Sequence, residues 1–162
     1  MYTPLQVIFW RHAEAEDASS ADGADADLRR ELTRQGRRDA SRMAAWIKAH
    51  VPKPWTVRAS PARRTMQTAN ALVDDPYTES LLAPGGSVDD VLRVIEHHRG
   101  QPSALVLCGH QPTLGAAALR WISGAEGDFS VRKGAVLWVM ERQREGAGAR
   151  VLRACVSPDL LE

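Results

Sequence analysis

The chain has 162 residues and a mass of 17.8 kDa, the usual size of a single domain, so we expect one domain over residues 1–162. Its 21 basic and 20 acidic side chains give a formal net charge of +1, which favours neither nucleic acid nor a membrane surface as a partner. Two cysteines are too few for a disulfide scaffold and the apolar run 5–10 is too short for a secretion signal or a membrane span, so we expect a cytoplasmic protein.

The first part of the chain predicts two strands and a helix. Residues 5–10 are apolar and partly β-branched, which indicates a buried strand, whereas the stretch 13–32 is rich in Ala and Asp and predicts a loop. Thr33 is placed to cap a helix that extends to about residue 50, where two prolines end it. A second strand is predicted over 55–59.

Two further helix starts surround a short strand in the middle of the chain. Ser60 followed by Pro61 predicts an N-cap with proline at the first helical position. A short strand is predicted over 77–81. Ser87, with Asp90 three residues later, has the spacing of a capping box, so an amphipathic helix is expected to begin there.

The last part of the chain completes the pattern. Residues 103–108 form the most hydrophobic predicted strand, and Pro112 opens the next helix. Residues 134–141 and 150–156 read as a closing hairpin across the Gly-rich loop 145–149. Because strands alternate with helices, we predict an α/β fold. It would be a three-layer sandwich with a mixed, mostly parallel central sheet and helices on both faces.

The near-zero net charge hides two segments of opposite sign. Residues 13–31 hold seven acids against two bases, a net charge of −5, and residues 32–70 hold nine bases against one acid, a net charge of +8. This pattern fits a solvated loop followed by a charged helix face, or else a positive pocket for an anion with an acidic rim. Charge alone favours the first interpretation.

Polar residues follow three of the predicted strands at their carboxyl ends, where ligands bind in sheets of this kind. They are the pair 11–12, the segment 60–64 and the pair 109–110. Arg11 at the end of an apolar strand needs an anionic partner, which could be a nearby glutamate or a substrate phosphate. A second arginine in the first turn of a helix opposes the helix dipole, which makes sense where an anion sits at that helix end.

Two histidines and two arginines at one rim have the chemistry of a phosphoryl-transfer pocket. Guanidinium groups hold the phosphoryl oxygens, one neutral imidazole attacks phosphorus, and the other donates a hydrogen bond to the developing charge. Cys108 and His110 lack a second ligand pair, so zinc is not predicted, and no metal or other cofactor is required.

These segments resemble the signatures of the histidine phosphatase superfamily, also called phosphoglycerate-mutase-like. The matching segments are Arg-His-Ala at 11–13, Leu-Thr and Gly at 32–36, Ser-Pro-Ala-Arg-Arg-Thr-Met-Gln-Thr at 60–68, and the apolar strand with Gly-His-Gln-Pro at 105–112. The short chain and its Ser-Pro-Asp-Leu ending are most similar to the bacterial SixA-type phosphohistidine phosphatases.

The resemblance implies a role for each matching residue. His12 would be the nucleophile that forms a phosphohistidine intermediate, and Arg11, Arg64 and His110 would bind the phosphoryl group. Arg64 is selected over Arg63 because it stands three residues before Gln67 in the motif. Ala13 departs from the usual glycine, so we expect a negative φ there.

The general acid of the ester-cleaving relatives has no clear counterpart. The alignment places Leu81 near that role, Glu79 lies two residues away, and Glu14 is a second candidate by its proximity to His12. An alkoxide leaving group needs a proton, whereas the labile P–N bond of phosphohistidine demands less. Only 29 residues separate Val73 from Ser103, which leaves little room for a lid.

The partner expected from this chemistry is therefore a phosphorylated protein, namely a histidine phosphotransfer domain. Two alternatives stay open. One is a small-molecule phosphomonoesterase of the same superfamily acting on a small phosphate ester, with Glu79 or Glu14 as acid. The other is a catalytically silent phosphate-binding module, which the presence of all four motif residues disfavours.

Overall fold

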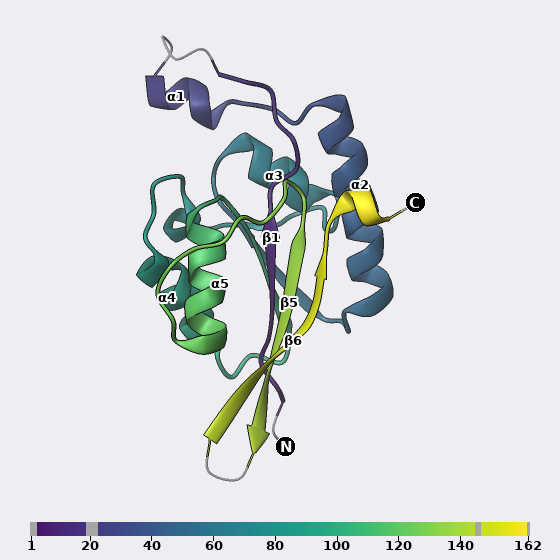
Figure 1. The fold of residues 1–162 in the computed structure, drawn as a ribbon. Coiled ribbons are helices and arrows are strands. Elements are labelled where there is room, and N and C mark those ends of the chain that lie inside the picture. Colours follow the sequence, from purple (N-terminus) through teal and green to yellow (C-terminus); the bar gives the residue numbers. More distant parts are fainter. Residues whose placement is uncertain (1–2, 19–22, 145–146, 162) are drawn as a thin grey trace.

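A computed structural model describes residues 3–18, 23–144 and 147–161 of the chain, which form one mixed sheet covered by helices (Figure 1). The strands lie in the order β3-β2-β4-β1-β5-β6. They are β1 (Gln6–Arg11), β2 (Trp55–Ala59), β3 (Tyr77–Thr78), β4 (Ala104–Gly109), β5 (Val136–Arg144) and β6 (Ala147–Val156). The strands from β3 to β1 are parallel, and β5 and β6 are antiparallel to their neighbours, which confirms the predicted sheet.

Helices cover both faces of this sheet. They are α1 (Gly23–Leu28), α2 (Arg34–His50), α3 (Arg63–Asn70), α4 (Val88–His98) and α5 (Thr113–Ser123), with short 3-10 helices η1 (Ser80–Leu82) and η2 (Pro158–Leu160). Successive side chains of β1 point to opposite faces of the sheet. Ile8 and Trp10 pack with α2 and α3, whereas Val7 and Phe9 pack with α4 and α5. The predicted three-layer sandwich is thus confirmed, with α2 and the α4–α5 pair on opposite sides in Figure 1. Within the described ranges, no helix is long and apolar enough to cross a membrane.

Two predicted helix starts are confirmed in detail. The Thr33 side chain accepts a hydrogen bond from the Gly36 backbone N–H and caps α2. Ser87 and Asp90 form a complete capping box at the start of α4. In both cases the capping groups lie within three residues of each other, so the local sequence is sufficient to place the helix end.

Three local predictions are wrong. The stretch predicted as a loop contains α1, which buries none of its residues and begins at Gly23 with a φ of 76°. The third helix begins at Arg63 with Ala62 as N-cap, so Ser60 does not cap it. The Ser60 hydroxyl instead contacts the Ala62 N–H and the ring of His110. The short strand predicted to reach residue 81 ends at Thr78, where η1 follows.

The closing hairpin is present, but its strands are longer than predicted. Residues 147–149 of the predicted Gly-rich loop belong to β6, and residues 145–146 lie outside the described residues. β5 pairs with β1 and so closes the parallel part of the sheet on the side away from β2. β1 and β4 therefore each have a neighbouring strand on both edges, and their carboxyl ends lie side by side in the middle of the sheet.

Candidate active site

The carboxyl ends of three parallel strands are held together by backbone hydrogen bonds. The register of β1 and β4 pairs Arg11 with Gly109, and the His12 N–H donates to the Gly109 carbonyl over 3.1 Å. The Ser60 N–H, just beyond β2, donates to the Cys108 carbonyl over 3.0 Å. The three polar segments predicted at the strand ends therefore meet, and all of them derive from the same parallel pairing.

His12 presents one imidazole nitrogen, Nε2, that has no hydrogen-bond partner among the described residues. Its side chain is almost fully buried, and Nδ1 lies 2.7 Å from its acceptor, the Ala13 carbonyl. Because a carbonyl can only accept, Nδ1 carries the proton and Nε2 keeps its lone pair. Burial, together with the positive charges of Arg64 and Arg11, lowers the pKa of His12 to about 4. The ring is consequently neutral at pH 7 and able to act as a nucleophile. Ala13, next to it, has the negative φ expected for a residue with a Cβ.

His110 faces His12, and its tautomer is set by its neighbours. The two ring centroids are 5.3 Å apart. His110 Nδ1 lies 3.4 Å from Arg64 Nη2, and His110 Nε2 lies 2.8 Å from Ser60 Oγ. A guanidinium has only donors, so Nδ1 accepts and the Nε2–H donates to Ser60. Burial and the charge of Arg64 lower the pKa of His110 to about 3, so this ring is also neutral.

Two arginines place positive charge close to the two histidines. Arg64, in the first turn of α3, has a side chain that is only 5% exposed, and its Nη1 donates to the Asp27 carbonyl over 2.7 Å. Arg11 donates through Nη1 to the Val131 carbonyl over 2.6 Å. The Nε atoms of both arginines are buried and have no hydrogen-bond partner among the described residues. Arg63, by contrast, is half exposed and pairs with Glu31 at 3.6 Å.

These side chains line a cleft of about 440 Å³ beyond the strand ends. Its cationic lining residues are Arg11, Arg30, Arg64 and Lys133. None of the described residues that line it is Asp or Glu. Such a surface attracts anions, and a neutral imidazole within it can attack a bound phosphoryl group.

The two carboxylates considered as a general acid lie elsewhere. Glu79 is the N-cap of η1 and accepts from Arg58 Nη1 at 3.2 Å. Glu14 accepts from the Thr33 hydroxyl at 2.9 Å. Neither is among the residues that line the cleft. The structure therefore does not bring either carboxylate together with the two histidines.

Three residues of the site were missed from the sequence, and the role of a fourth, Ser60, was assigned wrongly. Ser60 was interpreted as a helix cap, whereas its hydroxyl holds His110. Asp27 and Arg30 lie in the stretch predicted as a loop, and Lys133 lies in the segment before β5. One sequence signal pointed toward Asp27 and Arg30. The net charge changes from negative to positive between residues 31 and 32, a pattern that fits an acidic rim beside a positive pocket.

No metal centre is evident in the part of the chain that the structure describes. It contains no group of three or more His, Cys, Asp or Glu side chains that could hold a metal ion. Cys108 is fully buried in β4, and burial raises the pKa of its thiol well above the usual range. Its position makes it an apolar packing residue rather than a ligand.

Comparison with known proteins gives a consistent result. The family model described as histidine phosphatase superfamily (branch 1) matches residues 7–85. An uncharacterized protein of Mycobacterium tuberculosis is 34% identical over 129 residues, which cover 75% of this chain and 77% of that protein.

Solved structures agree over nearly the full length. The protein histidine phosphatase SixA, solved in complex with tungstate, is 25% identical with a TM-score of 0.79, covering 98% of this chain and 100% of the other. A SixA from Nakamurella multipartitia is 23% identical with a TM-score of 0.76, covering 97% and 98% of the two chains.

Proposed function

Because the chain belongs to the histidine phosphatase superfamily and is a phosphatase of the SixA type, we propose that it removes the phosphoryl group from phosphohistidine on a protein. The observation that carries the proposal is the neutral His12 ring with a free Nε2 beside Arg64, Arg11 and His110. The phosphate-like tungstate ion bound by the SixA relative agrees with a site for a tetrahedral oxyanion.

In the proposed mechanism, His12 Nε2 attacks phosphorus in line with the departing nitrogen of the substrate. The P–N bond of the substrate breaks as a new P–N bond to His12 forms, and water then releases phosphate from His12. Arg11 and Arg64 hold the non-bridging oxygens and offset their charge. His110 lies against Arg64 and completes the wall of the cleft.

The state of Asp27 favours a substrate whose leaving group needs little help from a proton donor. Asp27 is the carboxylate in contact with Arg64. Its partial burial alone would raise its pKa, but the hydrogen bond from Arg30 and the charge of Arg64 lower the pKa below its usual value. Asp27 is therefore ionised at pH 7 and cannot donate a proton to an alkoxide. Cleavage of a phosphoramidate depends less on such a donor.

The proposal is tested with a histidine phosphotransfer domain phosphorylated on histidine. We expect the protein to release inorganic phosphate from this substrate, and His12→Ala to abolish the release. His97→Ala is the matched control, because His97 is exposed at the end of α4. We also expect an acid-labile, base-stable phosphoenzyme with the wild-type protein. Rapid turnover of phosphoserine and p-nitrophenyl phosphate, with none of the phosphohistidine protein, would refute the proposal.

One observation supports a second candidate, a phosphomonoesterase acting on a small phosphate ester. The cleft has two cations, Arg30 and Lys133, beyond the two arginines assigned to the phosphoryl group. These could hold a second anionic group of a small substrate. A panel of phosphate esters with and without an added carboxylate distinguishes the two. Selective turnover of the doubly anionic esters, lost in Arg30→Gln, would favour this second candidate.

A further inference from the structure

Asp27 lies between two guanidinium groups at the edge of the cleft. Its Oδ2 accepts from Arg64 Nη2 at 3.2 Å, and its backbone carbonyl accepts from Arg64 Nη1 at 2.7 Å. On its other side, Oδ1 accepts from Arg30 Nη1 at 3.1 Å. Both arginines line the cleft. Two cations of the cleft therefore already converge on one carboxylate that the protein itself supplies.

This contact uses the donors of Arg64 that a phosphoryl group would need. Arg64 Nη2 is shared between Asp27 and His110, and Nη1 is engaged by the Asp27 carbonyl. Nη1 keeps one free N–H, whereas both N–H groups of Nη2 are engaged, so a phosphoryl group that binds Arg64 through both Nη atoms has to replace either Asp27 or His110 at Nη2. The two anions also repel each other when both lie against the same guanidinium.

The helix that carries Asp27 is weakly attached to the rest of the fold. The six residues of α1 include no buried side chain, and α1 starts at a glycine with positive φ. Among the described residues, the hydrogen bonds that α1 makes to the sheet-packed helices are those of the Asp27 carboxylate and carbonyl with Arg64. Because α1 contributes no buried residue to the core, we expect displacement of Asp27 to break mainly these polar contacts.

We propose that Asp27 competes with the phosphoryl group for Arg64 and thereby sets how tightly the cleft binds phosphate. The substrate displaces the carboxylate from Arg64, and Asp27 keeps its contact with Arg30. After hydrolysis, the same competition favours release of inorganic phosphate from Arg64. This proposal rests on the proposed function, because it takes Arg64 as a residue that binds the phosphoryl group.

The test compares two carboxylates of the same helix. Asp27→Asn keeps the shape of the side chain and removes its charge. Asp25→Asn makes the same change at an exposed position two residues earlier. We expect inorganic phosphate to bind Asp27→Asn about fivefold more tightly than it binds the wild-type protein, as measured by calorimetry. A fivefold change in affinity is the upper end of what a partly exposed ion pair contributes. Asp25→Asn should stay within about twofold of the wild type. Unchanged or weaker phosphate binding by Asp27→Asn would overturn the proposal.

A second measurement uses the wild-type protein and needs no substitution. During titration with inorganic phosphate, the backbone amide signals of α1 should shift in NMR spectra with the dissociation constant found by calorimetry. Amide signals of α1 that stay fixed while those of His12 and His110 shift would also overturn the proposal.

A failure of the Asp27 proposal can be distinguished from a failure of the proposed function. If the wild-type protein hydrolyses phosphohistidine and Asp27→Asn leaves phosphate affinity unchanged, only the competition by Asp27 is refuted. If the wild-type protein neither binds phosphate nor hydrolyses phosphohistidine, the proposed function fails as well.

Discussion

Replacing Ser60 by alanine tests whether a buried hydroxyl positions His110 for phosphoryl transfer. Ser60 is fully buried, and its Oγ accepts from His110 Nε2 at 2.8 Å and from the Ala62 N–H at 3.2 Å. Ser60→Ala removes the acceptor for both donors. A neutral hydrogen bond contributes about 1 kcal/mol, and a buried donor left unpaired costs about 1–3 kcal/mol. If roughly 1.4 kcal/mol of this is lost from transition-state binding, kcat/KM falls about tenfold.

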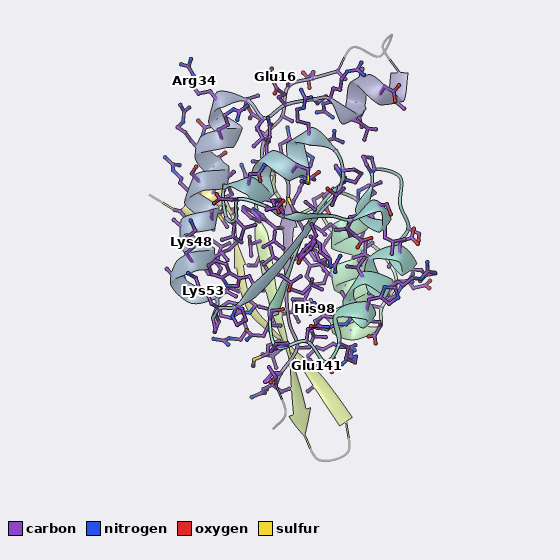
Figure 2. All side chains as sticks on the ribbon, turned by 180° about the vertical axis from the view of Figure 1, so that it is seen from behind. Glu16, Arg34, Lys48, Lys53, His98 and Glu141 are labelled. Atoms are coloured by element: carbon purple, nitrogen blue, oxygen red, sulfur yellow. The ribbon has the colours of Figure 1, made fainter. Side chains whose placement is uncertain are left out.

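A matched control exists at the other end of the molecule. Ser103 Oγ lies 3.3 Å from Nε2 of the buried His98. Figure 2 shows His98 toward the opposite end of the molecule from Glu16 and Arg34. Ser103→Ala therefore removes a serine hydroxyl from beside a buried imidazole and from Thr56 Oγ1, 2.6 Å away, without touching a residue that lines the cleft. His98 Nε2 keeps the Ser103 carbonyl, at 2.8 Å, as its acceptor.

The assay measures kcat/KM on the phosphohistidine substrate and the thermal midpoint Tm for both serine variants. We expect both variants to lose some stability and only Ser60→Ala to lose kcat/KM. If Ser60→Ala keeps kcat/KM within about twofold of the wild type, or if Ser103→Ala loses as much, Ser60 does not position His110.

Four further predictions concern charge, pH and packing. Arg64→Gln should lower kcat/KM roughly a hundredfold because charge-assisted hydrogen bonds to the phosphoryl group are lost, whereas the half-exposed Arg63→Gln should change it less than about twofold in the same assay. Since burial lowers the pKa of His12 to about 4, kcat/KM should be constant down to about pH 5 and fall only near pH 4; a decline centred near 6.5 would contradict the buried, neutral nucleophile. The unfolded chain binds a proton at His12 near pH 6.5 that the folded protein does not, so the free energy of unfolding should decrease as the pH falls from 6.5 to about 4 in a urea titration. Gly36→Ala should destabilise the protein by about 3 kcal/mol, seen as a lower Tm, because a Cβ there would collide with the Glu14 carbonyl; an unchanged Tm would refute this close packing.

The sheet was predictable because its signals are local and strong. The runs that became β1 and β4 are apolar because both of their faces are covered by helices, and such runs are visible in the sequence without a structure. Parallel pairing then requires their carboxyl ends to share one edge of the sheet. The meeting of His12 and His110 follows from this pairing alone.

The parts that were missed depend on contacts between distant residues. Asp27 meets Arg64 across 37 positions of sequence, and Ser60 meets His110 across 50. The helix α1 has no apolar face that a sequence pattern would reveal, since it buries no residue. Ser60 before a proline has the local pattern of an N-cap, but the hydroxyl was recruited by His110 and the helix starts three residues later.

The two charged segments of the sequence turn out to compensate each other in part at the cleft. Asp27 and Glu31 of the acidic segment contact Arg64 and Arg63 of the basic one. The fold therefore pairs charges that are far apart in the sequence, and Arg64 is neutralised in part by the protein itself. Without such a partner, Arg64 would be a buried cation with a large desolvation cost. The contact with Asp27 offsets part of this cost. Under the proposed competition, phosphate must bind Arg64 more strongly than the Asp27 carboxylate does. We therefore expect the proposed site to prefer a doubly charged phosphoryl group over singly charged anions.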